Sequence, residues 1–210
     1  MTKEYRASNG ELLEWDEALG IGYLPSNAGT ATYDEGYWNQ YMKLRDTDMG
    51  RALTNARIDL SVKAGATPST TLDIGIGNGQ FVEDFGCDGS DVNPHAIKWL
   101  KSIGKFSTPS TDYGYDWFTM WDVIEHIESG DFKELVKHNR VGIVLSTPIY
   151  TSYNDIITSK HFKPNEHIYY FTTNGLIYYM EYFGYKCVEM SSVETQLGRH
   201  SIGSFVFIKR

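Results

Sequence analysis

Short apolar runs alternate along the chain with segments in which apolar residues recur every three or four positions. The first pattern is typical of buried strands, and the second of helices that pack on one face. We therefore expect strands at residues 70–74, ending near 90, within 116–124, and at 142–148, 185–190 and 203–209, with a weakly patterned strand between 103 and 111. Helices are expected at residues 80–85, 94–102, 131–138 and 174–184.

The N-terminal part of the chain has a different pattern. Residues 1–30 mix Gly, Ser, Asn and Pro with isolated aromatic side chains, and we interpret this segment as an irregular lead-in. From Asp34 the apolar spacing turns helical, and Asp-Thr-Asp at 46–48 offers an N-cap for a second helix. Residues 1–62 are therefore predicted to form an extension with two helices, a candidate lid, before the main domain at residues 63–210.

Alternating strands and helices predict an α/β fold with a mostly parallel, seven-stranded sheet and helices on both of its faces. No helix separates the last two predicted strands, so we expect an antiparallel edge strand. A chain of 210 residues is long enough for one such domain with a full core.

Composition and charge exclude some partners. The formal net charge of −8 disfavours a broad grip on a nucleic-acid backbone, which needs clustered Lys and Arg. No apolar window approaches the roughly 18 residues that cross a bilayer, and the N-terminus lacks the apolar core of a signal peptide. We expect a cytoplasmic protein that contacts no membrane, in which Cys87 and Cys187 are buried, reduced thiols.

A glycine-rich turn follows the strand at 70–74, in the stretch TLDIGIGNGQF. Gly75, Gly77 and Gly79 stand at alternate positions, and glycine has no Cβ to keep a ligand away from the backbone. Ligands of open α/β sheets bind beyond the carboxyl ends of the strands. We therefore predict that this turn holds a nucleotide-like ligand.

Two acidic residues indicate which nucleotide. Asp73 stands beside the turn, and two like charges 4 Å apart repel by about 4 kcal/mol at an effective dielectric near 20. It would repel a pyrophosphate but favour S-adenosylmethionine, which carries a sulfonium and an ammonium group and no phosphate. Asp91 stands at the end of the next strand after Gly75 and is placed to accept the ribose hydroxyls, whereas Asn93 either assists or caps the next helix.

The stretches LDIGIGNGQF, GSDVNPHAI and YDWFTMWDVIEHI resemble class I S-adenosylmethionine-dependent methyltransferases, in particular the subgroup related to ubiquinone and small-molecule methyltransferases. A fourth stretch, HIYYFTTNGLIYYMEYFGY, is similar to that subgroup's segment after the fifth strand. The resemblance covers residues 70–210. It implies a Rossmann-like methyltransferase fold, S-adenosylmethionine as cofactor, and methyl transfer to a small-molecule acceptor.

The resemblance also implies roles for single residues. The three glycines would lie against the cofactor, with Asp73 near its methionine end and Asp91 at its ribose. Met120, Trp121 and Asp122 would line the end of the fourth strand, near the methionine and the reacting methyl. The adenine contact stays unassigned, because the third strand is weakly patterned.

Methyl transfer from a sulfonium is an in-line displacement that depends mainly on alignment, and a general base is needed only for a protonated acceptor. The candidate catalytic residues are Glu125 and His126 after the fourth strand and His167 after the fifth, with His161 as a further candidate base. Each is also open to interpretation as a structural polar group, His161 and His167 more so than Glu125 and His126. No set of carboxylates and histidines in the sequence predicts a metal site.

Two alternatives stay open. The first alternative to a methyltransferase is a non-catalytic S-adenosylmethionine-binding scaffold, since a fold does not establish activity. The second is an NAD(P)-dependent reductase. The reductase predicts a Tyr-x-x-x-Lys pair after the fourth helix, and none is placed there. The acceptor, the atom methylated and the oligomeric state are not assigned by the sequence.

Overall fold

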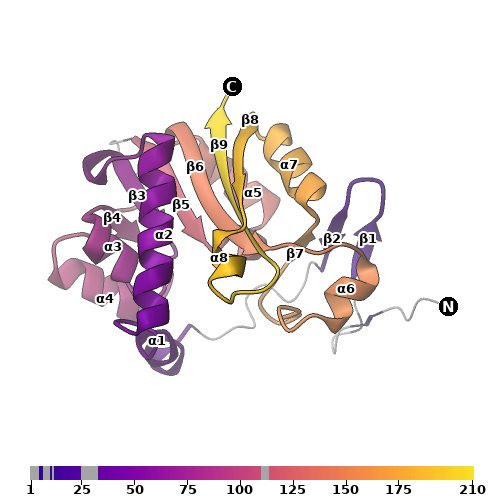
Figure 1. Ribbon diagram of the computed structural model, residues 1–210, viewed down its shortest axis with the longest axis horizontal. Coiled ribbons are helices and arrows are strands. Elements are labelled where there is room, and N and C mark those ends of the chain that lie inside the picture. The colour runs from indigo at the N-terminus through magenta and orange to yellow at the C-terminus, as the bar shows by residue number, and fades with distance from the viewer. Residues whose placement is uncertain (1–4, 7–9, 11, 25–32, 110–113) are drawn as a thin grey trace.

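The computed structural model describes residues 5–6, 10, 12–24, 33–109 and 114–210 and is built on a six-stranded sheet (Figure 1). The strand order is β4-β3-β5-β6-β9-β8. The strands are β3 (Thr71–Ile74), β4 (Asp88–Ser90), β5 (Tyr115–Trp121), β6 (Asn139–Pro148), β8 (Tyr185–Ser191) and β9 (Ile202–Lys209). Strands β4, β3, β5 and β6 are parallel, as predicted. Strand β9 is antiparallel to both β6 and β8, so the antiparallel strand lies second from the edge and β8 forms the edge itself.

The predicted count of seven strands is corrected to six for the described residues. The segment expected to pair beside β4 is reduced to one parallel bridge between Gly89 and Phe106. Two backbone hydrogen bonds hold it, from Gly89 N to Lys105 O at 2.8 Å and from Ser107 N to Gly89 O at 3.0 Å. Pro109 follows and has no N–H with which to extend the pairing.

Helices cover both faces of the sheet (Figure 1), as predicted. On one face α2 (Asp48–Ala64), α3 (Gln80–Phe85) and α4 (Pro94–Ser102) share a core cluster with the sheet. On the other face α5 (Ser129–Val136) and α7 (Thr173–Tyr182) share a second cluster. The predicted helices at 80–85 and 94–102 are confirmed residue for residue.

Strand β5 contributes side chains to both clusters because successive side chains of a strand point to opposite faces of the sheet. Trp117 and Trp121 pack in the cluster on the α2 side. Phe118 and Met120 pack in the cluster on the α5 side. This alternation decides which side chains of the strand approach the site described below.

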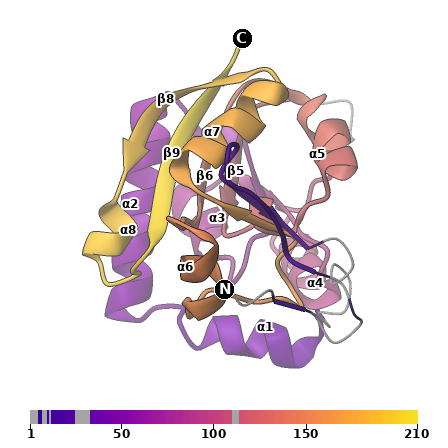
Figure 2. The same cartoon turned by 90° about the vertical axis from the view of Figure 1, so that its right-hand side faces the viewer.

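The interpretation of residues 1–30 as irregular is wrong for residues 14–23. Strands β1 (Glu14–Asp16) and β2 (Ile21–Tyr23) form a hairpin, and β2 pairs with β7 (Tyr169–Phe171) in a separate three-stranded sheet (Figures 1 and 2). Each strand is only three residues long, too short for a sequence pattern. The pairing of β2 depends on a segment far along the chain, which follows α6 (Tyr153–Thr158).

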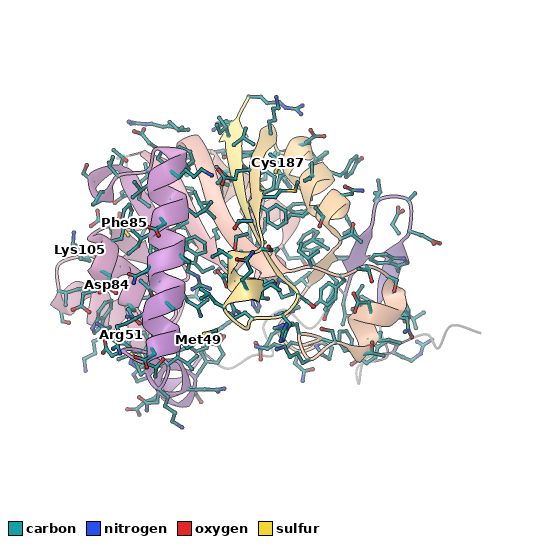
Figure 3. The ribbon with its side chains drawn as sticks, in the orientation of Figure 1. Met49, Arg51, Asp84, Phe85, Lys105 and Cys187 are labelled. Atoms are coloured by element: carbon teal, nitrogen blue, oxygen red, sulfur yellow. The ribbon has the colours of Figure 1, made fainter. Side chains whose placement is uncertain are left out.

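The two helices predicted in the extension are present as α1 (Glu35–Met42) and α2. Asp34 caps α1 by accepting from Tyr37 N at 2.9 Å, and Thr47 caps α2 by accepting from Gly50 N at 3.0 Å. Figure 3 labels Met49 and Arg51 at this end of α2. Helix α2 continues through the predicted division at 62–63 and packs on the sheet, so it belongs to the core.

The two cysteines are unpaired, as expected. Cys87 is buried, whereas Cys187 on β8 is only half-buried (Figure 3). None of the helices within the described ranges combines the length and the apolarity that crossing a bilayer would require.

Candidate active site

A cavity of about 520 Å³ opens at the carboxyl ends of β3, β4 and β5. Residues at the ends of these strands form its floor, and α1 covers it from outside. The lining from the strand ends is Ile74, Gly75, Gly77, Ser90, Asp91, Val92, Asn93, Trp121, Asp122 and Val123, and other lining residues include Tyr33, Tyr37, Trp38, Tyr41, His126, Asp131, Leu135 and Glu166.

The glycine turn contributes two of its three glycines to the cavity. Gly75, Gly77 and Gly79 all have positive φ, at 72°, 57° and 73°, a conformation in which only glycine is unstrained. Gly75 and Gly77 line the cavity. Gly79 does not, and a Cβ there would lie 2.4 Å from the ring of Trp99, so this glycine permits close packing of α3 and α4.

Asp91 lines the cavity at the end of β4 and is held by backbone donors. Its carboxylate accepts from Asn93 N at 2.8 Å. Burial raises the pKa of Asp91, and backbone hydrogen bonds from Asn93, Ile76 and Val92 oppose this shift. The carboxylate is therefore a fixed acceptor, positioned before any ligand arrives.

Asn93 also lines the cavity, and its side chain caps α4. The Oδ1 atom accepts from His95 N at 2.9 Å, while Nδ2 donates to Asp34 O at 3.3 Å. Of the two roles considered from the sequence, capping is the one that its contacts describe. The second contact ties the start of α4 to the cap of α1.

Asp73 and Met120 do not line the cavity. Asp73 lies between Leu72 and Ile74 on β3, and both neighbours point into the core cluster on the α5 side. By strand alternation Asp73 points to the other face of the sheet, where it accepts from Thr119 Oγ1 at 2.6 Å. Met120 is fully buried in the cluster on the α5 side.

Asp122 lines the cavity at the end of β5 and belongs to a partly buried ionic network. Its φ of 59° is left-handed, and its Oδ2 lies 2.8 Å from Arg199 Nη2 and 3.5 Å from Arg57 Nη2. Both arginines also bind Glu194, Arg57 through its Nε at 2.8 Å. Burial alone would raise the pKa of Glu194, but the two guanidinium groups lower it to about 2. Trp121 lies under the guanidinium of Arg57, 4.9 Å from the ring centroid.

Aromatic side chains of α1, together with Tyr33 two residues before it, form the outer wall. The rings of Tyr33 and Tyr37 lie 5.1 Å apart and those of Tyr37 and Tyr41 4.9 Å apart, and the latter two hydroxyls are 3.1 Å from each other. Trp38 packs against Trp99 of α4 at 6.1 Å. The cavity is thus closed on this side by a row of rings.

The charge of the lining is one-sided. Four acidic residues, Asp91, Asp122, Asp131 and Glu166, belong to the lining formed by the described residues, whereas no Lys or Arg does. Outside the lining, Arg57 and Arg199 bind the Asp122 carboxylate, and Lys163 Nζ lies 3.1 Å from Glu166 Oε2. A cationic ligand is favoured in such a cavity, and a pyrophosphate is disfavoured. The preference predicted from Asp73 stays a prediction, and Asp73 is not among the acids of the lining.

The three predicted catalytic residues lie together. Glu125 and His126 belong to the 3₁₀ turn η2 (Ile124–His126) after β5, and His167 precedes β7. Only His126 lines the cavity, and its Nδ1 donates to Glu166 O at 2.8 Å. Glu125 and His167 are buried. His161 is bound elsewhere, with its Nε2 2.8 Å from His200 O.

Two parts of the site were missed in the sequence. The network of Arg57, Asp122, Glu194 and Arg199 joins three distant segments and leaves no local pattern. Asp131 and Glu166 are ordinary charged residues in the sequence, and only the fold turns them toward the cavity. The aromatic wall had a signal, the four-residue spacing of Tyr33, Tyr37 and Tyr41.

Comparison with solved structures shows the fold. The magnesium protoporphyrin IX methyltransferase of Synechocystis PCC 6803, solved with bound S-adenosylhomocysteine, matches with a TM-score of 0.61 and 12% identity over 85% of this chain and 96% of that one. An S-adenosylmethionine-dependent methyltransferase from Aquifex aeolicus matches with a TM-score of 0.59 and 14% identity, over 82% of this chain and 98% of that one. Another from Archaeoglobus fulgidus matches with a TM-score of 0.56 and 21% identity, over 82% of this chain and 99% of that one. No family model and no curated protein matches the sequence.

Proposed function

The chain has the fold of class I S-adenosylmethionine-dependent methyltransferases, and we propose that it shares their activity: it binds S-adenosylmethionine in the cavity and transfers the methyl group to a small-molecule acceptor. One observation carries the proposal. The Gly75–Gly77 turn and the fixed carboxylate of Asp91 meet at the ends of adjacent strands, in a cavity whose described lining is acidic and has no basic side chain apart from His126.

The cavity fits this cofactor in size and chemistry. Its volume of about 520 Å³ falls within the range of about 300–1,000 Å³ common for small-ligand sites. Asp91 is placed for the ribose hydroxyls, Gly75 and Gly77 leave room for close approach to the backbone, and the acids suit a ligand with two positive groups. Asp73 and Met120 lie outside the lining and would not touch the cofactor.

S-adenosylmethionine, when bound, supplies a methyl group made electrophilic by its sulfonium sulfur. The protein's task is then mainly alignment, which can contribute several kcal/mol to lowering the barrier. Trp121 and Asp122 would lie at the methionine end, where Arg57 and Arg199 would hold the Asp122 carboxylate in place. His126 lines the cavity, and its Nδ1 proton is committed to Glu166 O at 2.8 Å.

The aromatic wall bears on the acceptor. Tyr33, Tyr37, Trp38 and Tyr41 offer ring faces, which suit a planar or cationic acceptor through stacking and cation–π contacts. The similar protein from Synechocystis is a methyltransferase of magnesium protoporphyrin IX. We extend to this chain only the broader expectation of a small organic acceptor beneath α1.

Calorimetry with S-adenosylmethionine, S-adenosylhomocysteine and NADPH tests the proposal. We expect both adenosyl compounds to bind with one site per chain and NADPH not to bind; binding of NADPH alone would support a reductase instead. The Asp91→Ala variant should bind S-adenosylmethionine about tenfold or more weakly, a loss of about 1.4 kcal/mol or more. Asp84→Ala is the matched control, because Asp84 is an exposed acid on α3 outside the lining (Figure 3). Transfer of labelled methyl from S-adenosylmethionine to fractions of a cell extract tests catalysis. If no fraction becomes labelled, the result favours a non-catalytic scaffold.

A further inference from the structure

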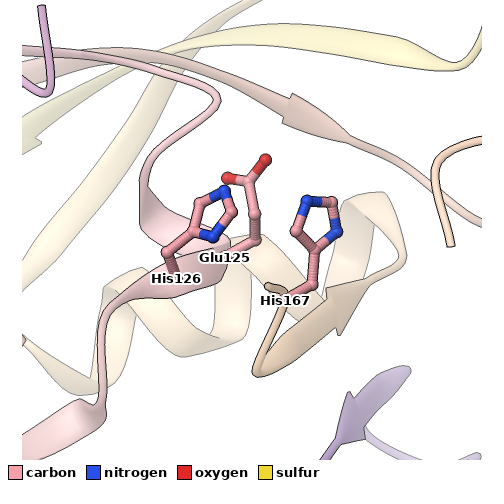
Figure 4. Close-up of side chains that lie close together, drawn as sticks. All are labelled: Glu125, His126 and His167. Carbon is pink, nitrogen blue, oxygen red and sulfur yellow. The ribbon is translucent and has the colours of Figure 1, made fainter. Parts of the chain in front are cut away.

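Glu125, His126 and His167 form a compact cluster (Figure 4), and His126 is the member that lines the cavity. One potential ligand atom from each residue lies within 4.8 Å of the other two. The imidazole rings of the histidines are 4.7 Å apart and nearly perpendicular, at 87°. A backbone hydrogen bond of 2.8 Å from Ile168 N to Glu125 O holds the two contributing segments together.

The hydrogen bonds around the cluster leave acceptor atoms free. His126 Nδ1 lies 2.8 Å from Glu166 O, a carbonyl that can only accept, so Nδ1 carries the proton and Nε2 presents a lone pair. Such a bond from the far nitrogen to a carbonyl is the usual second contact of a metal-binding histidine. Thr147 Oγ1 donates to Glu125 Oε2 at 3.0 Å, which leaves Oε1 available.

Glu125 Oε1 is buried without any hydrogen-bond partner among the described residues. Glu125 is 1% exposed and His167 4%. A buried carboxylate oxygen without a partner is unusual in a folded protein and needs an explanation.

We propose that Glu125, His126 and His167 bind one divalent transition-metal cation, and that the metal faces the cavity beside His126 and binds an oxygen of the methyl acceptor. Two imidazoles and one carboxylate are a donor set typical of Zn²⁺ and of non-haem Fe²⁺ and related metals, with coordination positions left open.

The second half of this inference rests on the proposed methyl transfer. A hydroxyl bound to a divalent cation is acidified, as metal-bound water is, and would release its proton to solvent. Its oxygen would then form the new C–O bond while the C–S bond breaks and the sulfur leaves as a neutral thioether. The acceptor class inferred is thus a compound with a hydroxyl group.

Cobalt binding tests the metal site without any assay of activity. The full chain is stripped with a chelator and titrated with Co²⁺, followed by visible absorption and by calorimetry. We expect one Co²⁺ per chain, and a loss of affinity of about 100-fold or more in Glu125→Gln and His167→Ala, because removing a direct ligand should cost at least the roughly 10–100-fold that follows loss of an outer partner. His138→Ala is the matched control, since His138 lies between α5 and β6, outside the cluster.

S-adenosylmethionine binding is measured on the same samples, both as a check of folding and to separate the two proposals. Variants that keep cofactor affinity but lose Co²⁺ support the metal site. A wild-type chain that binds S-adenosylmethionine but no stoichiometric Co²⁺ overturns the metal site and leaves the methyltransferase proposal standing. A chain that binds Co²⁺ through these residues but no adenosyl compound supports the metal site and contradicts the proposed function. If Glu125→Gln and His167→Ala bind Co²⁺ as tightly as His138→Ala does, the cluster is not the site.

Discussion

Asp73 and Thr119 share a 2.6 Å hydrogen bond between the neighbouring strands β3 and β5. Both side chains are fully buried. Burial raises the pKa of Asp73 to about 8, although the Thr119 hydrogen bond and the charge of Arg57 act to lower it. The folded protein therefore holds this acid mainly protonated at neutral pH.

Stability should decline with rising pH because of Asp73. Between about pH 4 and pH 8 the unfolded chain has an ionised Asp73 while the folded chain keeps the proton, so the folded state loses relative stability as pH rises. The Asp73→Asn variant keeps an acceptor for Thr119 and does not titrate. The free energy of unfolding of the variant should therefore rise relative to that of the wild type between pH 5 and pH 8.

Urea unfolding at several pH values within this window measures the difference. Asp91, Arg57 and Cys87 are the other titratable groups that interact with Asp73, and all are unchanged in the variant. Asp84→Asn provides the comparison, since Asp84 is exposed. A difference between Asp73→Asn and wild type that does not vary with pH would show that Asp73 ionises normally in the fold.

Alanine substitution at Gly77 and at Gly104 distinguishes the cost of backbone strain from the loss of cofactor contact at the glycine turn. Gly77 and Gly104 both have positive φ, at 57° and 69°, and an alanine in this conformation costs about 1–2 kcal/mol. A Cβ at Gly77 would lie 3.6 Å from the Tyr41 ring, at the cavity wall, whereas one at Gly104 would meet nothing within 4 Å. We expect Gly77→Ala and Gly104→Ala to lose similar stability.

Only Gly77→Ala should also weaken S-adenosylmethionine binding, by about tenfold, or roughly 1.4 kcal/mol. Thermal unfolding and calorimetry on both variants give the two quantities. Equal cofactor affinity in Gly77→Ala and Gly104→Ala would mean that the ligand does not approach this turn.

Replacing Glu194 by the neutral Gln should lower the free energy of unfolding more than the same change at an exposed glutamate. It is fully buried between Arg57 and Arg199, and removing one partner of a buried ion pair costs about 3–5 kcal/mol. The exposed pair of Glu181 and Arg210, at 2.6 Å, is the control, because surface pairs contribute only about 0–1 kcal/mol. We expect Glu194→Gln to be strongly destabilised at neutral pH, and Glu181→Gln to resemble the wild type.

The pH dependence of the same pair of variants checks the cause. The folded-state pKa of Glu194 is lowered from 4.5 to about 2, so its contribution is complete above pH 4.5 and is lost as pH falls toward 2. The gap between wild type and Glu194→Gln in urea unfolding should therefore narrow in acid. A gap of constant size would mean that packing, not charge, is responsible.

The sequence predicts the parts of this molecule that local pattern determines. Helices at 80–85 and 94–102 follow from apolar spacing, from Gly86 after the first helix and from Pro94 at the start of the second. The glycine turn and Asp91 can be predicted because each belongs to a short run of consecutive residues at the end of a strand. Their meeting in one cavity follows from the common edge of parallel strands.

The remainder depends on contacts between distant segments. The hairpin of β1 and β2 exists through pairing with β7, and strand alternation turns Asp73 and Met120 away from the cavity although both stand at strand ends. The cluster of Glu125, His126 and His167 has the same origin. Its members were predicted as separate candidate catalytic residues, and only the pairing of η2 with the segment before β7 brings them within reach of one ion.

Helix α1 should respond to the cofactor more than any other helix. None of its residues is buried, and it rests over the cavity through the rings of Tyr37, Trp38 and Tyr41. Helix α2 next to it has buried residues, among them Thr54 and Leu60, and packs on the sheet. Segments with few buried contacts open most readily to hydrogen exchange, so the free protein should exchange rapidly at residues 35–42.

A ligand that fills the cavity would give α1 the packing surface that it lacks. We expect saturating S-adenosylmethionine to slow amide exchange in residues 35–42 by about fivefold or more, well within the roughly 100-fold available at a ligand concentration of 100 times Kd. Residues 48–64 should change less. Mass spectrometry of exchanged peptides measures both segments in one experiment, and Asp91→Ala at the same ligand concentration should lose the effect. If calorimetry demonstrates binding and α1 still exchanges at its unliganded rate, the helix is a fixed wall and the extension is no lid.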